Sequence, residues 1–146
     1  MTPTAVSPPD AARFLDSMAS PNPSVRRAAA AFARRRGAGA LPGLADLAAS
    51  SDRAIAKAAQ KAMADITHHA ARPGVSGEAR QAAATLRTIA QATARPRMVR
   101  AHALHLLGFV ATAADVPGLH ALLADTEVGT DARLALERIS GKAAKR

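Results

Sequence analysis

Histidine is the residue in this sequence best suited to metal binding, and two histidines stand one helical turn apart. His102 and His105 form that pair, and His68 and His69 are adjacent to each other earlier in the chain. A zinc site needs several converging ligands, and no Asp or Glu stands at helical spacing from His102 and His105. Cysteine is absent, which excludes thiolate ligands and disulfides. We therefore expect neither a tight metal site nor a cofactor, and we expect His68 and His69 to end a helix, where an imidazolium is favoured by the helix dipole.

Residue patterns typical of catalysis are also missing. The sequence has no nucleophile elbow, no phosphate-binding glycine-rich loop and no HExxH motif. Its eleven acidic residues are scattered, so no carboxylate pair stands out as an acid and a base. We expect a protein that is not an enzyme.

Arginine dominates the charge, and the formal net charge is +9 at pH 7. In the segment 76–94, Arg80, Arg87 and Gln91 recur at steps of seven and four residues, which aligns them on one helix face. This stripe is a candidate binding site for a phosphate backbone, which binds through release of counterions. The alternatives are a solvated helix face and an arginine excess that reflects the coding bias of a GC-rich genome. The absence of Trp and Tyr argues against stacking of single-stranded nucleic acid.

The elements that must position these residues are helices. Nearly half of the residues are apolar and only Phe14, Phe32 and Phe109 are aromatic, so the core must be built from Ala, Leu, Ile, Val and Met. Alanine has the highest helix propensity, and the class is therefore all-α. The sequence shows no signal-peptide pattern and no apolar run that could span a bilayer, so we expect a cytoplasmic protein without a membrane partner.

Apolar periodicity and capping residues predict the helix positions. Asp52 and Asp115 are expected to cap helices, and Thr130 or Asp131 the last one, while Gly37 and Gly141 are expected to end helices. The expected helices span 10–18, 22–36, 41–49, 53–71, 76–94, 95–111, 116–124 and 131–140. In the last of them, Leu134, Leu136 and Ile139 are expected to face inward, as are the three phenylalanines.

The segment 95–125 is the expected centre of the fold, because it reads as two helices folded back on each other. Its first helix is apolar on two sides and must be covered on both. One side carries Val99, Ala103, Leu106 and Val110, and the other carries Leu104, Leu107 and Ala111.

A second copy of this pattern precedes it. The segment 22–66 matches 95–139 at offsets of 73 to 75 residues. The matched positions are Val25–Arg26 with Val99–Arg100, Phe32 with Leu106, Pro42–Leu44 with Pro117–Leu119, Asp52 with Asp125, Ile55 with Val128 and Ile66 with Ile139. Internal similarity of this kind is the sequence signature of a solenoid, in which each unit buries its apolar face on the next.

These residues resemble the HEAT-repeat family of armadillo-type helical repeats. The resemblance rests on Val99–Arg100, Ala103, Leu106–Gly108, Pro117–Leu119, Leu122–Leu123 and Asp125. It implies an α-α superhelix, a short right-handed solenoid of antiparallel helical hairpins. It also places Arg80, Arg87 and Gln91 in the concave groove, because the second helix of each hairpin lines that groove in this family.

The expected organisation is a flexible segment 1–9, one HEAT-like repeat domain at 10–141 and a basic tail at 142–146. The expected function is that of a non-catalytic scaffold that binds a protein partner through its concave surface. One alternative is sequence-nonspecific binding of a nucleic-acid backbone through the arginines. Another, implied by the resemblance, is an accessory enzyme similar to the HEAT-like bilin lyases.

Overall fold

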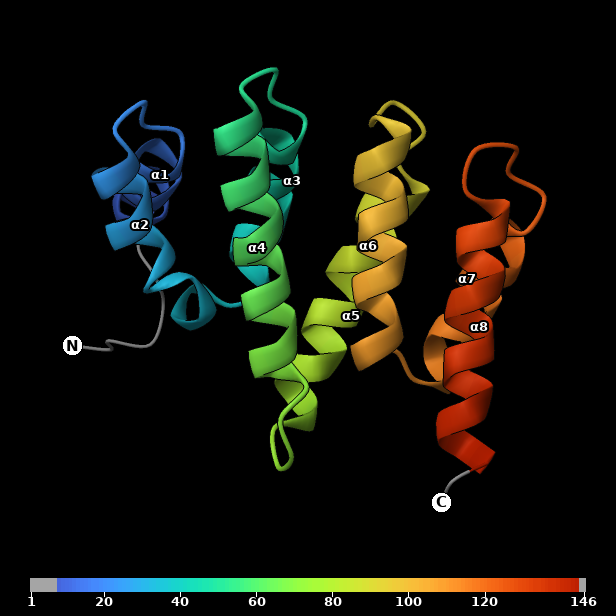
Figure 1. The fold of residues 1–146 in the computed structure, drawn as a ribbon. Helices are drawn as coiled ribbons and strands as arrows, with labels where there is room; N and C mark the ends of the chain where they lie inside the picture. Colours follow the sequence, from blue (N-terminus) through green and yellow to red (C-terminus); the bar gives the residue numbers. More distant parts are fainter. Residues whose placement is uncertain (1–7, 145–146) are drawn as a thin grey trace. The chain divides into compact units, whose positions relative to one another are not determined.

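The computed structural model describes residues 8–144, and all regular secondary structure in that range is helical (Figure 1). The all-α class is therefore confirmed. The helices are α1 Pro8–Met18, α2 Pro23–Ala30, α3 Leu41–Ala48, α4 Arg53–Ala70, α5 Ser76–Gln91, α6 Arg97–Val110, α7 Val116–Leu122 and α8 Gly129–Ala144. Three short 3-10 helices accompany them: η1 Ala33–Arg36, η2 Ala38–Ala40 and η3 Ala113–Asp115.

The chain forms two compact units, and the boundary between them lies inside α4. Unit 1 is Met1–Ile66 and unit 2 is Thr67–Arg146. Of the predicted flexible segment, residues 1–7 lie outside the described range, and Pro8 and Pro9 begin α1. None of the described helices combines the length and the apolarity needed to cross a bilayer.

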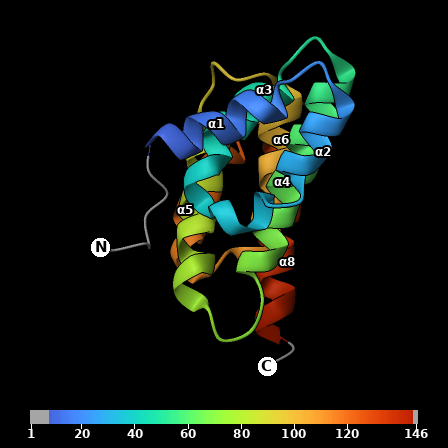
Figure 2. The same cartoon turned by 90° about the vertical axis from the view of Figure 1, so that its left-hand side faces the viewer.

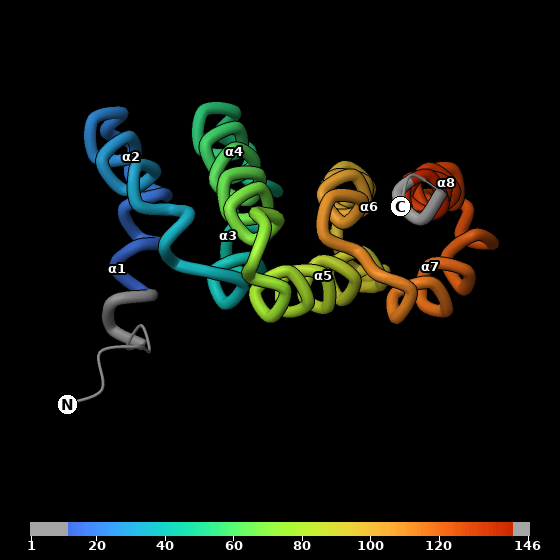
Figure 3. Tube along the Cα trace, turned by 90° about the horizontal axis from the view of Figure 1, so that it is seen from below, coloured from blue at the N-terminus to red at the C-terminus, as the bar shows by residue number. Residues whose placement is uncertain are grey.

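Unit 2 consists of two helical hairpins. Helix α5 packs against α6 and α7 against α8, and the hairpins contact each other through α6 with α8 and α5 with α7. Figure 3 shows α6 and α8 in one layer and α5 and α7 in the other. The predicted hairpin of 95–125 is therefore wrong, because α6 and α7 belong to different hairpins. The apolar pattern of α6 required cover on two sides, as its eight buried residues confirm, but it did not specify which helices supply that cover.

Unit 1 is organised around α1, which contacts both α2 and α3 (Figure 2). Phe14 and Met18 of α1 are buried, as predicted. Helix α2, however, ends at Ala30 and η1 follows, so the predicted continuous helix 22–36 is wrong. Phe32 is 51% exposed and Val25 38% exposed, so neither belongs to the core.

Asp52 caps α4 as predicted, and Asp125, the position matched to it in the sequence, forms similar hydrogen bonds before α8. The Oδ1 atom of Asp52 accepts hydrogen bonds from the backbone N–H groups of Ala54 and Ile55, at 3.0 and 3.3 Å. The Oδ1 atom of Asp125 accepts from Glu127 and Val128 in the same way, at 2.8 and 3.1 Å. Matched positions thus form matched turns, one before α4 and one before α8.

Two other predicted caps are wrong. Thr130 and Asp131 lie inside the first turn of α8, which begins at Gly129 because Asp125 already organises the preceding turn. The carboxylate of Asp115 caps nothing in α7; it accepts a hydrogen bond from the Thr112 backbone N–H at 2.9 Å and completes a capping box on η3.

The Pro-Gly-Leu sequences occupy equivalent places in the two units. Leu44 and Leu119 are fully buried in α3 and α7. A Cβ on Gly43 would lie 2.5 Å from the Leu15 side chain of α1, and a Cβ on Gly118 would lie 2.7 Å from the Arg87 side chain of α5. The missing Cβ therefore allows a side chain of α1 to lie against α3, and a side chain of α5 to lie against α7.

The C-terminal helix departs from the predictions in two ways. Leu134 is 51% exposed, whereas Leu136 and Ile139 are half-buried, because Ala132 and Ala135 supply the fully covered face of α8. Gly141 does not end the helix, which continues to Ala144; a single glycine costs a helix only about 1 kcal/mol. Most of the predicted basic tail is thus helical in its backbone, and residues 145–146 lie outside the described range.

Candidate binding surfaces

The predicted stripe on α5 is brought against α7. The guanidinium of Arg87 pairs with the carboxylate of Asp115 at 2.5 Å, and the Asp115 side chain is only 6% exposed. The side chains of Arg87 and Gln91 both lie against Gly118, where a Cβ would be 2.7 and 3.1 Å from them. Arg80 lies two turns earlier on α5 and is exposed. Arg87 therefore serves the contact between α5 and α7, and its charge is matched within the protein.

A buried arginine joins several elements of unit 2. The sequence analysis identified it only as part of the repeat pattern. Arg100 is 1% exposed. Its Nε donates to the carbonyl oxygen of Ala90 at 2.8 Å, and its two terminal nitrogens donate to Asp125 at 2.7 Å and Glu127 at 3.2 Å. The hydrogen bond from Arg100, with those from the backbone of Glu127 and Val128, lowers the pKa of Asp125 to about 2. This cluster joins the end of α5 to the loop between α7 and α8.

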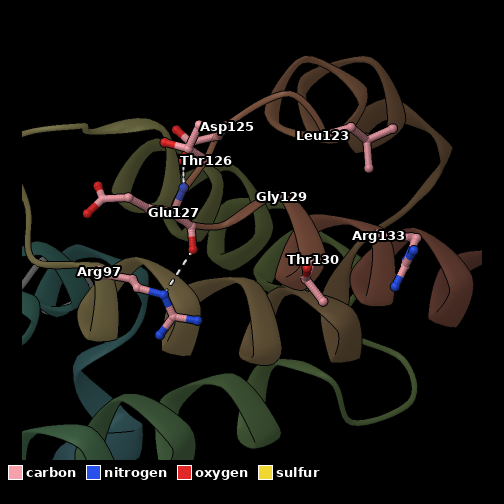
Figure 4. A pocket seen from close by; sticks show the side chains of 8 residues that line it. All are labelled: Arg97, Leu123, Asp125, Thr126, Glu127, Gly129, Thr130 and Arg133. Carbon is pink, nitrogen blue, oxygen red and sulfur yellow. Dashed lines mark hydrogen bonds between the residues drawn. The ribbon is translucent and has the colours of Figure 1, made fainter.

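An open cavity of about 410 Å³ lies beside the same loop (Figure 4). Arg97 spans part of it: its Nε donates to the carbonyl oxygen of Glu127 at 3.0 Å, and its guanidinium lies 3.7 Å from the Asp131 carboxylate. The cavity is lined by Arg97, Leu123, Asp125, Thr126, Glu127, Gly129, Thr130 and Arg133. Two arginines face two acidic residues here, so the lining has no dominant sign of charge, and it contains no recognisable pair of nucleophile and base.

A third feature, which we call the Phe109 surface, combines an exposed aromatic ring with basic side chains. It consists of His68, His105, Phe109, Leu134 and Arg138. The His68 and His105 rings meet the Phe109 ring edge-on, with centroids 4.7 and 5.5 Å away. The Arg138 guanidinium lies over the same ring, 5.3 Å from its centroid. Phe109 is 38% exposed and Leu134 is 51% exposed, so apolar and cationic groups reach solvent together.

Three helices position this surface. His68 lies in the last turn of α4, as the sequence predicted for the end of a helix. Arg138 of α8 crosses to α6, where it donates to the His105 carbonyl oxygen at 3.2 Å and lies against Gly108. Sequence reasoning missed the surface, because it placed Phe109 on an inward face. The four-residue step from His105 to Phe109 was the available signal.

Arg138 is the permanent positive charge of the Phe109 surface, and it affects the neighbouring histidines. The pKa of His105 is lowered by partial burial and by the neighbouring Arg138 and His68. The pKa of His102 is lowered by burial and by His105, and its Nδ1 is buried without a hydrogen-bond partner. An approaching carboxylate would raise the pKa of His105 again, since an opposite charge nearby favours the charged form of a histidine.

The histidines do not gather further ligands. Among residues 8–144, no three side chains of His, Cys, Asp or Glu converge in a way that could hold a metal ion. The absence of a tight zinc site remains a prediction; stoichiometric zinc that survives dialysis, and that is lost when His102 and His105 are replaced by Ala, would contradict it.

The fold defines an all-helical protein, and the comparisons with known proteins add no closer relationship. No protein-family model, no curated protein and no solved structure matches this chain.

Proposed function

We propose that the protein is a short HEAT-type solenoid that binds an acidic segment of a partner protein through the Phe109 surface, without catalysis. The two hairpins of unit 2, packed with like helices in the same layer, support the solenoid. The matched turns at Asp52 and Asp125, and the matched close approaches at Gly43 and Gly118, support the internal repeat. Stacked repeats of this kind present extended surfaces to their partners.

The observation that carries the binding proposal is the exposed Phe109 ring with three basic side chains around it. Aromatic residues and arginine are enriched among the residues that dominate protein interfaces. The guanidinium of Arg138 favours an acidic group next to this apolar anchor. The net charge of +9 steers an acidic partner towards the protein and raises its association rate. The unidentified segment is therefore one that carries an apolar side chain between carboxylates.

A nucleic-acid backbone fits this structure less well. Backbone binding requires several cations that neutralise phosphates from one face. In the predicted stripe, Arg87 is already paired with Asp115, and Gln91 carries no charge. The experiment that follows therefore includes a DNA duplex, so that nucleic-acid binding can be distinguished from peptide binding.

The test uses two probes and the full chain. One is a fluorescein-labelled peptide of glutamates with a central leucine and phenylalanine, and the other is a labelled DNA duplex. We expect the peptide to bind, with affinity that falls as salt rises. Phe109→Ala and Arg138→Glu should each weaken binding by about 10-fold or more, as expected for residues that dominate an interface.

The matched control is Lys57→Glu, which makes the same change of charge as Arg138→Glu at an exposed position of unit 1. It should alter peptide affinity much less. Equal losses from Arg138→Glu and Lys57→Glu would show that net charge alone attracts the peptide, and would overturn the proposed site. Duplex affinity that exceeds peptide affinity and falls with Arg80→Glu would favour the nucleic-acid function instead.

A further inference from the structure

Helix α2 of unit 1 leaves an apolar stripe exposed that its counterpart in unit 2 buries. No residue of α2 is buried, whereas α6 buries eight. Val25 is 38% exposed and the matched Val99 is 3% exposed; Phe32 is 51% exposed and the matched Leu106 is 2% exposed. The two segments therefore carry the same pattern, and only one of them is covered by other helices.

The backbone keeps Val25 and Phe32 on one side. Ala31 has helical dihedral angles and its N–H bonds to the Arg27 carbonyl oxygen at 3.1 Å. The N–H of Phe32 bonds to the Ala29 carbonyl oxygen at 3.0 Å. The helical turn thus continues, in tightened form, to Phe32. A separation of seven residues, two turns, places the two side chains along one face.

Exposed cations follow this stripe along the chain. Residues 17–45 contain five arginines and no acidic residue. Three of the five have partners within unit 1: Arg26 donates to the Ser20 carbonyl oxygen at 2.7 Å, Arg27 donates to the Ser24 hydroxyl oxygen at 3.5 Å, and Arg36 lies over the Phe14 ring at 5.3 Å. Arg34 and Arg35 are exposed, and Arg35 lies 5.8 Å from the centroid of the Phe32 ring.

We propose that this α2 surface, consisting of Val25 and Phe32 with the exposed Arg34 and Arg35 that follow them, docks an amphipathic helix of a partner protein. The occupant is a helix because the matched stripe of α6 is covered in an all-helical packing, and because positions two turns apart match the apolar stripe of a helix. The partner helix carries acidic residues beside its apolar stripe, since exposed arginines flank the docking face.

A second copy of this chain fits the α2 surface less well. The copy would also carry a net charge of +9, and like charges brought together in an interface cost binding free energy. The α2 surface lies in unit 1 and shares no residue with the Phe109 surface, so this inference does not depend on the proposed function.

The experiment measures binding of a labelled helical peptide that has leucines at helical spacing and glutamates elsewhere. The full chain is compared with the double variant Val25→Asp and Phe32→Asp, with Met98→Asp as a control at an exposed apolar position outside both surfaces, and with Leu134→Asp, which alters the Phe109 surface. We expect the double variant to lose at least about 10-fold in peptide affinity, because two apolar contacts are removed and carboxylates face carboxylates. Met98→Asp should retain the affinity for this peptide.

Thermal unfolding of the double variant provides the second measurement. Since Val25 and Phe32 are exposed, we expect the unfolding temperature to change little. A large decrease would show that the stripe is covered within the folded chain, and would overturn the inference. Unchanged peptide affinity in the double variant would overturn it as well. If Leu134→Asp loses peptide affinity and the double variant keeps it, the peptide binds the Phe109 surface instead. If the unaltered chain is a dimer and the double variant is a monomer, the α2 surface binds a second copy of the chain.

Discussion

Arg100 is a buried residue whose hydrogen bonds join several elements of unit 2. Its guanidinium is buried, and its removal from water is offset only because a backbone carbonyl and two carboxylates receive its hydrogen bonds. Asp125 serves twice, as a partner of Arg100 and as the cap of the turn before α8. The loss of either residue therefore affects α5, α6 and α8 together.

We predict that Arg100→Leu destabilises the protein by about 1 to 3 kcal/mol, because the Ala90 carbonyl oxygen and the two carboxylates lose their hydrogen-bond donor. The measurement is urea unfolding followed by circular dichroism. Arg133→Leu is the control, because Arg133 is exposed on α8 of the same unit, and we expect it to change stability by less than about 0.5 kcal/mol. Similar losses for the two variants would contradict the structural role of Arg100.

Acidification should reduce stability in two separate ranges of pH. The folded pKa values of His102 and His105 lie below the ordinary value of 6.5, so the unfolded chain binds protons first and stability falls as the pH drops below about 6.5. The folded pKa of Asp125 is about 2 against an ordinary 3.8, so its contribution is present above 3.8 and is lost towards pH 2.

Two variants separate these ranges in unfolding experiments at stepped pH. His102→Gln should flatten the decline that begins near pH 6.5, the ordinary histidine pKa. Asp125→Asn should flatten the decline between pH 3.8 and about 2, at the cost of lower stability at neutral pH. A profile that remains the same in both variants would assign the acid sensitivity to other groups.

At the level of single elements, α8 shows how tertiary contacts decide the effect of a glycine. Gly129 is the first residue of α8 and lies close to another backbone segment. A Cβ there would be 2.6 Å from the Leu123 carbonyl oxygen. Gly141 lies in the last turn of the same helix, and a Cβ added there would meet no atom within 4 Å. The same substitution should therefore have opposite effects at the two ends of α8.

We predict that Gly141→Ala stabilises the protein by about 0.5 to 1 kcal/mol, because alanine has the higher helix propensity. Gly129→Ala should destabilise it, since the Leu123 carbonyl belongs to the backbone and cannot rotate away as a side chain could. Thermal unfolding of the two single variants is the measurement. The same direction of change for both would show that the close approach at Gly129 is relieved without cost.

At the level of the whole molecule, the segments 22–66 and 95–139 share local features without sharing the same burial. The order of helices is the same in 22–66 and 95–139, and both Pro-Gly-Leu leucines are fully buried. The stripes on α2 and α6 differ, however, because one is exposed and the other is covered. Local sequence determines the features that the two segments share, whereas the burial of each stripe depends on the helices packed against it.

We predict that Leu44→Ala and Leu119→Ala each destabilise the protein by about 2 to 5 kcal/mol, the usual cost of a cavity in a packed core. The measurement is chemical denaturation. Leu134→Ala is the control, because that side chain is 51% exposed, and we expect it to cost far less. A small effect at Leu44 or Leu119 would contradict their equivalence as core positions.

The sequence by itself determined the helical class and most helix positions. Periodic apolar residues, frequent alanine and the Asp52 cap act within a few residues of each other, so they can be read from the chain directly. The same local signals correctly placed Phe14 and Met18 in the core and His68 at a helix end.

Only the tertiary structure decided which helices pair and which candidate residues meet. An apolar face shows that a helix needs cover, but it does not name the helix that supplies it; α6 was therefore assigned to the wrong hairpin, and Phe32 and Leu134 to the core. The pairs Arg87–Asp115 and Arg100–Asp125 join residues more than twenty positions apart. Such contacts depend on how helices pack in three dimensions, and local spacing along the chain does not specify them.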